Sequence, residues 1–404
     1  MQSSAPPAMR WSLVFAAAGI LLITTGARQS LGLFIAPLHV DTGVGLVAIS
    51  FALAIGQFTW GAVQPLFGAL AGRHGSSVVL IGGLLLLTGG LAAAAFARSE
   101  ATLIATLGVL SAAGAGAASF AILIGAVAGR LPAERRSFAA GVINAGASMG
   151  QFVFAPIAQA LIAFGGWAFA LLALAASTLL ALPLVGALRG GATPSAAAPA
   201  AGPGLRAQLG LACRDRSYVL LHLSFFTCGL HIAFLVTHLP GEVSLCGLPA
   251  DVSARSIALI GLFNIAGSLA AGALGNRMPM KYLLAAMYAS RALIIAVYLV
   301  APRTPMTYYV FSALLGLSWL ATVPPTAGLV GKLFGTQHLA TLFGLTLLSH
   351  QVGAFFGAWL GGVALAAAGD YRWMWYADIV LATGAAIACL PIREPGYAAR
   401  TAVS

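Results

Sequence analysis

The sequence predicts an all-α membrane protein in which twelve transmembrane helices form two pseudo-symmetric six-helix bundles. The first observation is composition, because 60% of the 404 residues are hydrophobic and only 7% are charged, too few charges for the surface of a soluble protein. The second is a series of apolar stretches of about 20 residues or more, the length at which a helix crosses a bilayer. The third is an internal repeat that relates the two halves of the chain.

The apolar stretches are read as helices because hydrocarbon requires every backbone hydrogen bond to be made within the segment. Glycines recur at four-residue spacing, as at Gly353, Gly357 and Gly361, which allows helix backbones to approach closely in lipid. Twelve such stretches lie near residues 11 to 36, 46 to 71, 77 to 97, 102 to 129, 137 to 164, 166 to 188, 217 to 240, 254 to 275, 282 to 301, 305 to 331, 339 to 367 and 372 to 391.

A polar, low-complexity segment divides the stretches six and six. Residues 189–216 are rich in Gly, Pro and Ala with basic ends, which is typical of a flexible or partly extended linker. We therefore expect one six-helix bundle at 1–188, a cytoplasmic linker at 189–216, a second bundle at 217–391 and a cytoplasmic tail at 392–404.

The halves carry similar residues in the same order, and a six-plus-six repeat is typical of secondary transporters whose site lies at the midplane between the repeats. The matching positions are Gly68 to Arg73 with Gly272 to Arg277, Arg28 with His231, and Pro37 with Pro240.

The formal net charge of +11 reflects membrane topology rather than nucleic-acid binding. With both termini inside, most basic residues fall in cytoplasmic segments, as the positive-inside rule requires; examples are Arg135, Arg136, Arg214 and Arg216. We expect a multi-pass protein of the inner (plasma) membrane with both termini cytoplasmic. The first apolar stretch is too long for a cleavable signal peptide and contains Arg28, so it is expected to remain as a helix.

Catalytic and metal-binding patterns are absent from the sequence. Cys213, Cys228, Cys246 and Cys389 have no metal-ligand spacing and are read as small apolar fillers. HExxH, Walker A and G-x-S-x-G motifs are also missing. We expect no enzyme activity, no cofactor and no metal, and an ion or solute gradient as the energy source.

The stretch GALAGRHGSS at residues 68–77 resembles the signature between the second and third helices of the major facilitator superfamily. Arg73 and Gly75 are in place, whereas Gly72 stands where an aspartate is usual. The resemblance covers essentially the whole chain. It implies the major facilitator fold and transport by alternating access.

A second pattern lies in the fifth predicted helix, at Arg135 to Gly141, Ala145, Gly146, Ser148, Gly150, Ala155 and Pro156. This pattern resembles the monocarboxylate porter family. Its members carry lactate-, pyruvate- or oxalate-like anions, often with protons, and often place a substrate-binding cation where Arg28 stands. The animal carriers have an arginine and an aspartate in the eighth helix where this chain has Ser268 and Asn264, so the substrate stays open.

Arg28 is one of two basic residues deep inside apolar stretches, where a cation costs about 2.5–3.5 kcal/mol or more. It precedes Pro37 by nine residues, roughly 13 Å of helix rise, which places it near mid-membrane. Its planar guanidinium matches a carboxylate, so Arg28 is the predicted anion site. The alternative is an arginine that bonds carbonyls of neighbouring helices.

His231 lies at the corresponding depth in the second half and could bind the coupling proton, since histidine titrates near neutral pH. The alternative is a neutral histidine bonded to a backbone carbonyl. Arg291, the other deep basic residue, is expected to form a buried ion pair with Asp378. A proton-relay role for Asp378 is the rival interpretation.

Further polar side chains recur on single helix faces and are expected to face the cavity or each other, because polar groups are expensive in lipid. The predicted substrate-binding residues are Arg28, Gln57, Asn144, Gln151, His231, Asn264, His350 and Gln351.

The sequence thus predicts a secondary active transporter that moves a small organic anion, foremost a monocarboxylate, across the inner membrane with proton coupling. An antiporter that exports drugs or metabolites is the alternative, followed by a non-transporting membrane sensor. The expected partners are an anionic small molecule, protons and the lipid bilayer, with no nucleic acid, and the expected state is a monomer.

Overall fold

The computed structural model describes residues 11–128, 130–131, 133–189, 205–275, 277–335 and 339–394, and nearly all of them are helical. The first half comprises α1 (Trp11–Gln29), η1 (Leu31–Phe34), α2 (Ile35–Thr42), α3 (Leu46–Ala62), α4 (Gln64–His74), α5 (Ser76–Ala94), α6 (Glu100–Leu103), η2 (Ile104–Ser111), α7 (Ala112–Ala117), α8 (Phe120–Ala128), α9 (Ala133–Leu179) and α10 (Leu182–Ala187). The second comprises α11 (Leu205–Arg214), α12 (Arg216–Leu245), α13 (Ala250–Leu274), α14 (Met280–Val300), α15 (Pro305–Ser318), α16 (Val323–Phe334), α17 (Leu339–Ala368) and α18 (Arg372–Cys389).

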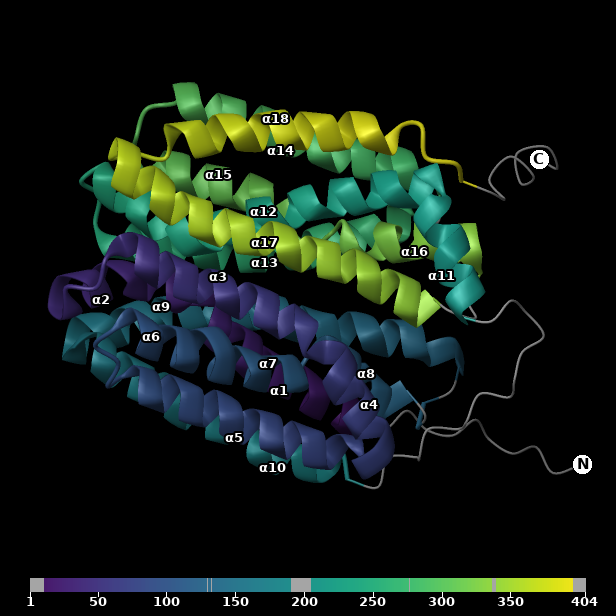
Figure 1. Cartoon of the computed structure of the whole chain (residues 1–404), viewed down its shortest axis with the longest axis horizontal. Helices are drawn as coiled ribbons and strands as arrows, with labels where there is room; N and C mark the ends of the chain where they lie inside the picture. The colour runs from purple at the N-terminus through teal and green to yellow at the C-terminus, as the bar shows by residue number, and fades with distance from the viewer. Residues whose placement is uncertain are drawn as a thin grey trace, which may run out of the picture.

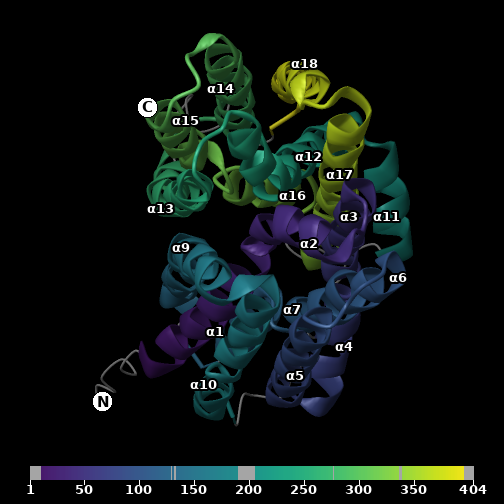
Figure 2. The same ribbon diagram turned by 90° about the vertical axis from the view of Figure 1, so that its left-hand side faces the viewer.

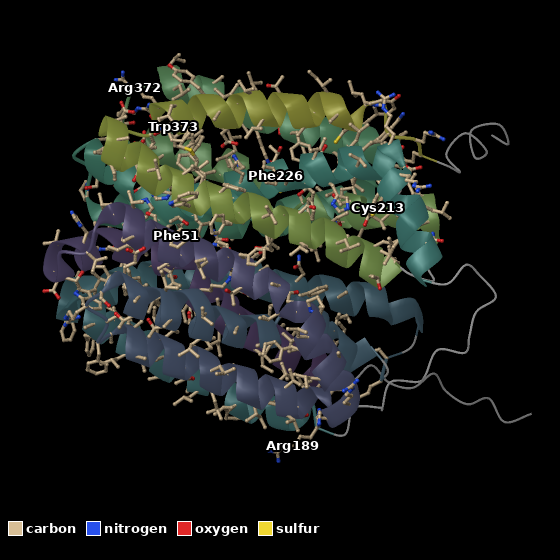
Figure 3. All side chains as sticks on the ribbon, in the orientation of Figure 1. Phe51, Arg189, Cys213, Phe226, Arg372 and Trp373 are labelled. Carbon is tan, nitrogen blue, oxygen red and sulfur yellow. The ribbon has the colours of Figure 1, made fainter. Side chains whose placement is uncertain are left out.

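The helices form two bundles that lie side by side, α1 to α10 in one and α12 to α18 in the other (Figure 1). The turned view in Figure 2 shows α9 next to α13, and α3 next to α17, where the bundles meet. Arg189 and Cys213 lie at one end of the molecule, which we name the linker end (Figure 3). Arg372 and Trp373 lie at the opposite end, named the far end.

By length and composition, nine helices of the described residues can cross a membrane, or ten if α3 and α4, bent by 42°, are one span. Twelve stretches were expected, and two features explain the difference. The run Ala139–Ala187 joins two predicted stretches, although the backbone breaks at Gly166, which has a φ of 79°. The last helix, α18, contains Arg372 and Asp378 and is less apolar. If the run is divided at Gly166 and α18 is added to the ten, the described helices provide twelve candidate crossings.

The expected flexible linker is in part a helix. Residues 190–204 and 395–404 lie outside the described residues, but Leu205–Arg214 forms α11. Gln208 of α11 donates to the Phe334 carbonyl and Ala212 is buried. Apolar residues on one face of this short segment provide the packing energy that a Gly/Pro linker lacks.

Glu394 secures the end of the described chain at the linker end. Its carboxylate accepts hydrogen bonds from the backbone N–H groups of Met280 and Lys281, and it pairs with Lys332 at 2.5 Å. Although Glu394 is an acidic residue, only 2% of its side chain is exposed. A carboxylate in this position satisfies the free donors at the start of α14 and complements its helix dipole.

The hydrophobic cores show how the two halves meet. One cluster contains residues of both halves, such as Phe34 and Leu38 with Val236, Leu239 and Trp375, and lies toward the far end. Two further clusters each belong to one half and reach the linker end, one at Leu188 and the other at Ala212. Within the described residues, the halves therefore share a core at the far end and have separate cores at the linker end.

Glycines set the closest helix contacts, and the two halves repeat the arrangement. In the first half a Cβ at Gly146 or Gly150 of α9 would overlap carbonyls of α1. In the second half a Cβ at Gly353 or Gly357 of α17 would overlap the carbonyls of Phe226 and Leu230 of α12. These contacts place α1 and α12 firmly within their bundles.

Candidate functional site

Arg28 lies at the end of α1 beside two side chains of α3. Its Nη1 donates to Gln57 Oε1 at 2.7 Å, and its guanidinium lies 4.3 Å from the centroid of the Trp60 ring. Gln57 and Trp60 are three positions apart and so project from one face of α3. A neutral amide acceptor and an aromatic face both stabilise a cation without cancelling its charge.

Arg28 lines a small cavity between the two halves. The cavity measures about 20 Å³, room for about one water molecule. Gln57 and Ser111 line it from the first half, and Val236 and Thr237 of α12 line it from the second. No carboxylate is among the lining residues or the described contacts of Arg28. An anion bound here would be the group that neutralises Arg28.

His231 does not line this cavity and instead contacts Asp378 of α18. His231 Nδ1 and Asp378 Oδ2 are 2.6 Å apart, and the side chains are 1% and 0% exposed. Among the described residues His231 Nε2 and Asp378 Oδ1 have no hydrogen-bond partner. The predicted position of His231 opposite Arg28 is thus corrected. The pair is a buried acid and base that could exchange a proton.

The predicted ion pair between Arg291 and Asp378 is wrong, because among the described residues the two form no salt bridge and each has other partners. Arg291 of α14 donates to the carbonyls of Ser318 and Trp319, and to Cys228 Sγ at 3.1 Å. These carbonyls lie where the tenth span is interrupted between α15 and α16. Backbone groups left free inside a membrane must find a partner, and the guanidinium supplies it. The alternative that was considered for Arg28, an arginine bonded to carbonyls of a neighbouring helix, is therefore found at Arg291.

Asn264 and Gln151 lie where α13 meets α9 of the other half. Asn264 Nδ2 donates to Ser148 Oγ at 2.8 Å, and Asn264 Oδ1 accepts from the Leu320 N–H at 2.9 Å. Gln151 is 1% exposed, and its Nε2 has no partner among the described residues. The Gln151 Cβ packs near Gly261 of α13. Both predicted ligands thus belong to the contact between the halves.

The other predicted ligands lie outside the cavity at Arg28. His350 and Gln351 of α17 are buried and lie 3.2 Å apart through Nδ1 and Nε2, and Gln351 packs against the position of Gly61 in α3. Asn144 is half-buried on α9. Of the predicted set, only Gln57 shares the lining of that cavity with Arg28.

Sequence reasoning missed an acid, an aromatic donor and an arginine that recur together near the far end of each half. In the first half Trp167 Nε1 donates to Asp41 at 2.9 Å, and Arg98 lies over the Trp167 ring. The second-half counterparts are Glu242, which accepts from the Tyr298 hydroxyl at 2.6 Å, and Arg303, which lies over the Tyr298 ring. The two arginines, at similar places in the repeat, were the available signal.

Two bundles of membrane-length helices, with a cation-lined cavity between them, define a polytopic membrane transporter. No group of three metal-ligating side chains occurs within the part of the chain that the structure describes. The sequence model of the Major Facilitator Superfamily matches residues 14–358, and the chain belongs to that family.

Relatives and solved structures agree with this membership. The chain is 26% identical to Monocarboxylate transporter 13 of Bos taurus over 365 residues, 89% of this chain and 84% of that protein. It is 28% identical to Monocarboxylate transporter 11 of Homo sapiens over 391 residues, 92% of this chain and 80% of that protein. The crystal structure of a D-xylose-proton symporter has the same fold, with a TM-score of 0.72, 13% identity, and coverage of 95% and 97% of the two chains.

Proposed function

We propose that this protein is a secondary transporter that moves a small organic anion, of the monocarboxylate class, across the inner membrane by alternating access with proton coupling. The observation that carries the proposal is Arg28, a cation in the cavity between the halves whose described contacts are a neutral amide and a ring face. The names of the monocarboxylate transporter relatives support the substrate class.

The His231–Asp378 pair is the proposed proton site. Its two side chains are almost wholly buried and lie 2.6 Å apart, and histidine binds or releases a proton near neutral pH. The pair lies within the second half, so the proton and the anion occupy different sites. With the linker end cytoplasmic, as the basic residues predict, the two halves have separate hydrophobic cores on the cytoplasmic side.

The test is counterflow of labelled lactate, pyruvate, oxalate and aromatic carboxylates in proteoliposomes, with and without a pH gradient. Arg28→Gln is expected to abolish organic-anion flux, because it removes the guanidinium and retains a polar side chain. Arg255→Gln, which changes an exposed arginine paired with Asp251, is the matched control and should transport normally. Wild-type flux that survives in Arg28→Gln would refute the anion site.

The proton site is tested in the same vesicles. His231→Gln is expected to retain exchange and to lose uptake driven by a pH gradient, because glutamine cannot bind a proton. If His231→Gln responds to the gradient as the wild type does, the pair is not the coupling site. Export of cationic or neutral drugs with no flux of any carboxylate would favour the antiporter alternative.

A further inference from the structure

The turn at residues 319–322, between α15 and α16, contacts polar side chains from three other helices. Arg291 of α14 bonds the carbonyls of Ser318 and Trp319 at the start of the turn. The Trp319 ring meets the His231 ring of α12 edge-on at 5.9 Å. Asn264 of α13 accepts the Leu320 N–H. The turn is thus in contact with the proposed proton site and with α13.

Asn264 connects this turn to the other half of the molecule. Its Oδ1 accepts from Leu320 at 2.9 Å, and its Nδ2 donates to Ser148 Oγ of α9 at 2.8 Å. The side chain is fully buried, and both bonds come from one planar amide. A shift of Leu320 therefore changes the position of the donor that bonds Ser148. Because neither partner is replaced by solvent there, a lost bond would be felt by both helices.

We infer that Asn264 is a positioning residue that transmits the charge state of the His231–Asp378 pair, through the turn at 319–322, to the contact between the halves. The inference rests on the proposed function, in that the proton is taken as the coupling ion. A proton that binds His231 Nε2 turns the imidazole into an imidazolium beside the Asp378 carboxylate and the Trp319 ring. The changed charge alters the force on Trp319 and hence on Leu320.

Charged and titratable groups around the His231–Asp378 pair connect it to the turn at residues 319–322. The Arg291 guanidinium of α14 lies 5.5 Å from the centroid of the Tyr288 ring. Arg291 also donates to Cys228, which is three positions before His231 on α12. His350 of α17 lies against Phe225, also on α12. Arg291 bonds both Cys228 and the turn, so added charge at His231 acts on a network already joined to residues 318–319.

The inference is tested by comparing two activities in proteoliposomes, counterflow without a pH gradient and its stimulation by a pH gradient. Asn264→Ala and Ser148→Ala are expected to lower the ratio of pH-stimulated uptake to counterflow about fivefold or more relative to wild type, whatever their effect on counterflow alone. The double variant should lose no more than Asn264→Ala alone, because Ser148→Ala removes a bond that Asn264→Ala already removes. Ser268→Ala, which removes only a weak 3.4 Å bond to Asn264 Oδ1, is the control.

Stimulation at the wild-type level in Asn264→Ala, or losses that multiply in the double variant, would overturn the inference. Should Asn264→Ala fail to fold, Ser148→Ala decides, because its hydroxyl belongs to α9 and leaves the bond to Leu320 intact. Failure of the proposed function gives a different pattern, since it shows in the wild type and in Arg28→Gln. A wild type without any response to a pH gradient would refute both the coupling ion and this inference.

Discussion

The two deep arginines have different surroundings, and we propose different roles for them. Arg28 has one amide acceptor and one ring face at a cavity between the halves. Arg291 is 1% exposed and donates hydrogen bonds to two carbonyls and a thiol of the same half. An arginine with carbonyl partners is bound by the protein itself, whereas we propose that Arg28 uses its remaining donors to bind the ligand.

Trp60 is expected to contribute to anion affinity because its ring orients the Arg28 guanidinium. Loss of such a cation–π contact costs about 0.5–2 kcal/mol. Trp60→Ala should therefore raise the KM for the transported anion about threefold or more, with Trp60→Phe closer to wild type. Uptake kinetics check this, with Trp373→Ala, an exposed far-end tryptophan, as control. Equal KM values in Trp60→Ala and Trp373→Ala would contradict it.

Arg291→Gln is expected to destabilise the protein rather than to block substrate binding. The change frees two buried carbonyls at the interrupted tenth span, and breaking a buried charged contact costs about 3 kcal/mol or more. The melting temperature in detergent should fall by several degrees, whereas Arg255→Gln should change it little. An unchanged melting temperature would show that the carbonyls find other partners.

Sequence alone could place Arg28 and His231 at matching depths, because the repeat aligns them. It could not show which way the His231 side chain points, since α12 has neighbours on several sides and carries polar residues on more than one face. The hydrogen-bond partners of Arg291 could not be predicted from the sequence either. Backbone carbonyls become available only where a helix is interrupted, and the interruption at 319–322 is a feature of the folded chain.

At the scale of elements, the paired helices α12 and α17 depend on glycine. Gly229→Ala places a methyl group on the carbonyl of His350, a backbone atom that cannot move aside without shifting α17. We expect a lower melting temperature and poorer yield of folded protein. Gly82→Ala is the matched control, because α5 has open space at Gly82 and alanine favours a helix by about 1 kcal/mol. Equal stability of the two variants would contradict this packing.

The helices themselves were predictable because apolar length and glycine spacing are properties of single segments. The helix α11 was not, since its few apolar residues are too short a pattern to outweigh the flanking Gly and Pro. The boundary between the predicted stretches 137 to 164 and 166 to 188, in contrast, agrees with the backbone break at Gly166, where φ is 79°.

At the scale of the whole molecule, the shared core at the far end predicts that the halves must separate there during transport. Ser50 of α3 and Gly362 of α17 adjoin across this contact, close enough for a disulfide after a small backbone shift. Ser50→Cys combined with Gly362→Cys should cross-link under mild oxidation and lose uptake, and a reductant should restore it. Each single cysteine variant is the control. Full transport in the cross-linked protein would contradict alternating access by separation at this end.

The contacts of the Glu394 side chain determine how many residues can be removed from the carboxyl end of the chain. Its carboxylate accepts from the first backbone N–H groups of α14 and pairs with Lys332, which lies in the last turn of α16. A fluorescent reporter or affinity tag attached beyond residue 394 leaves this anchor in place. A truncation that removes Glu394 instead leaves the first N–H groups of α14 without this acceptor. Because α14 also carries Arg291, loss of the Glu394 side chain would weaken the packing around Arg291, about half a membrane away.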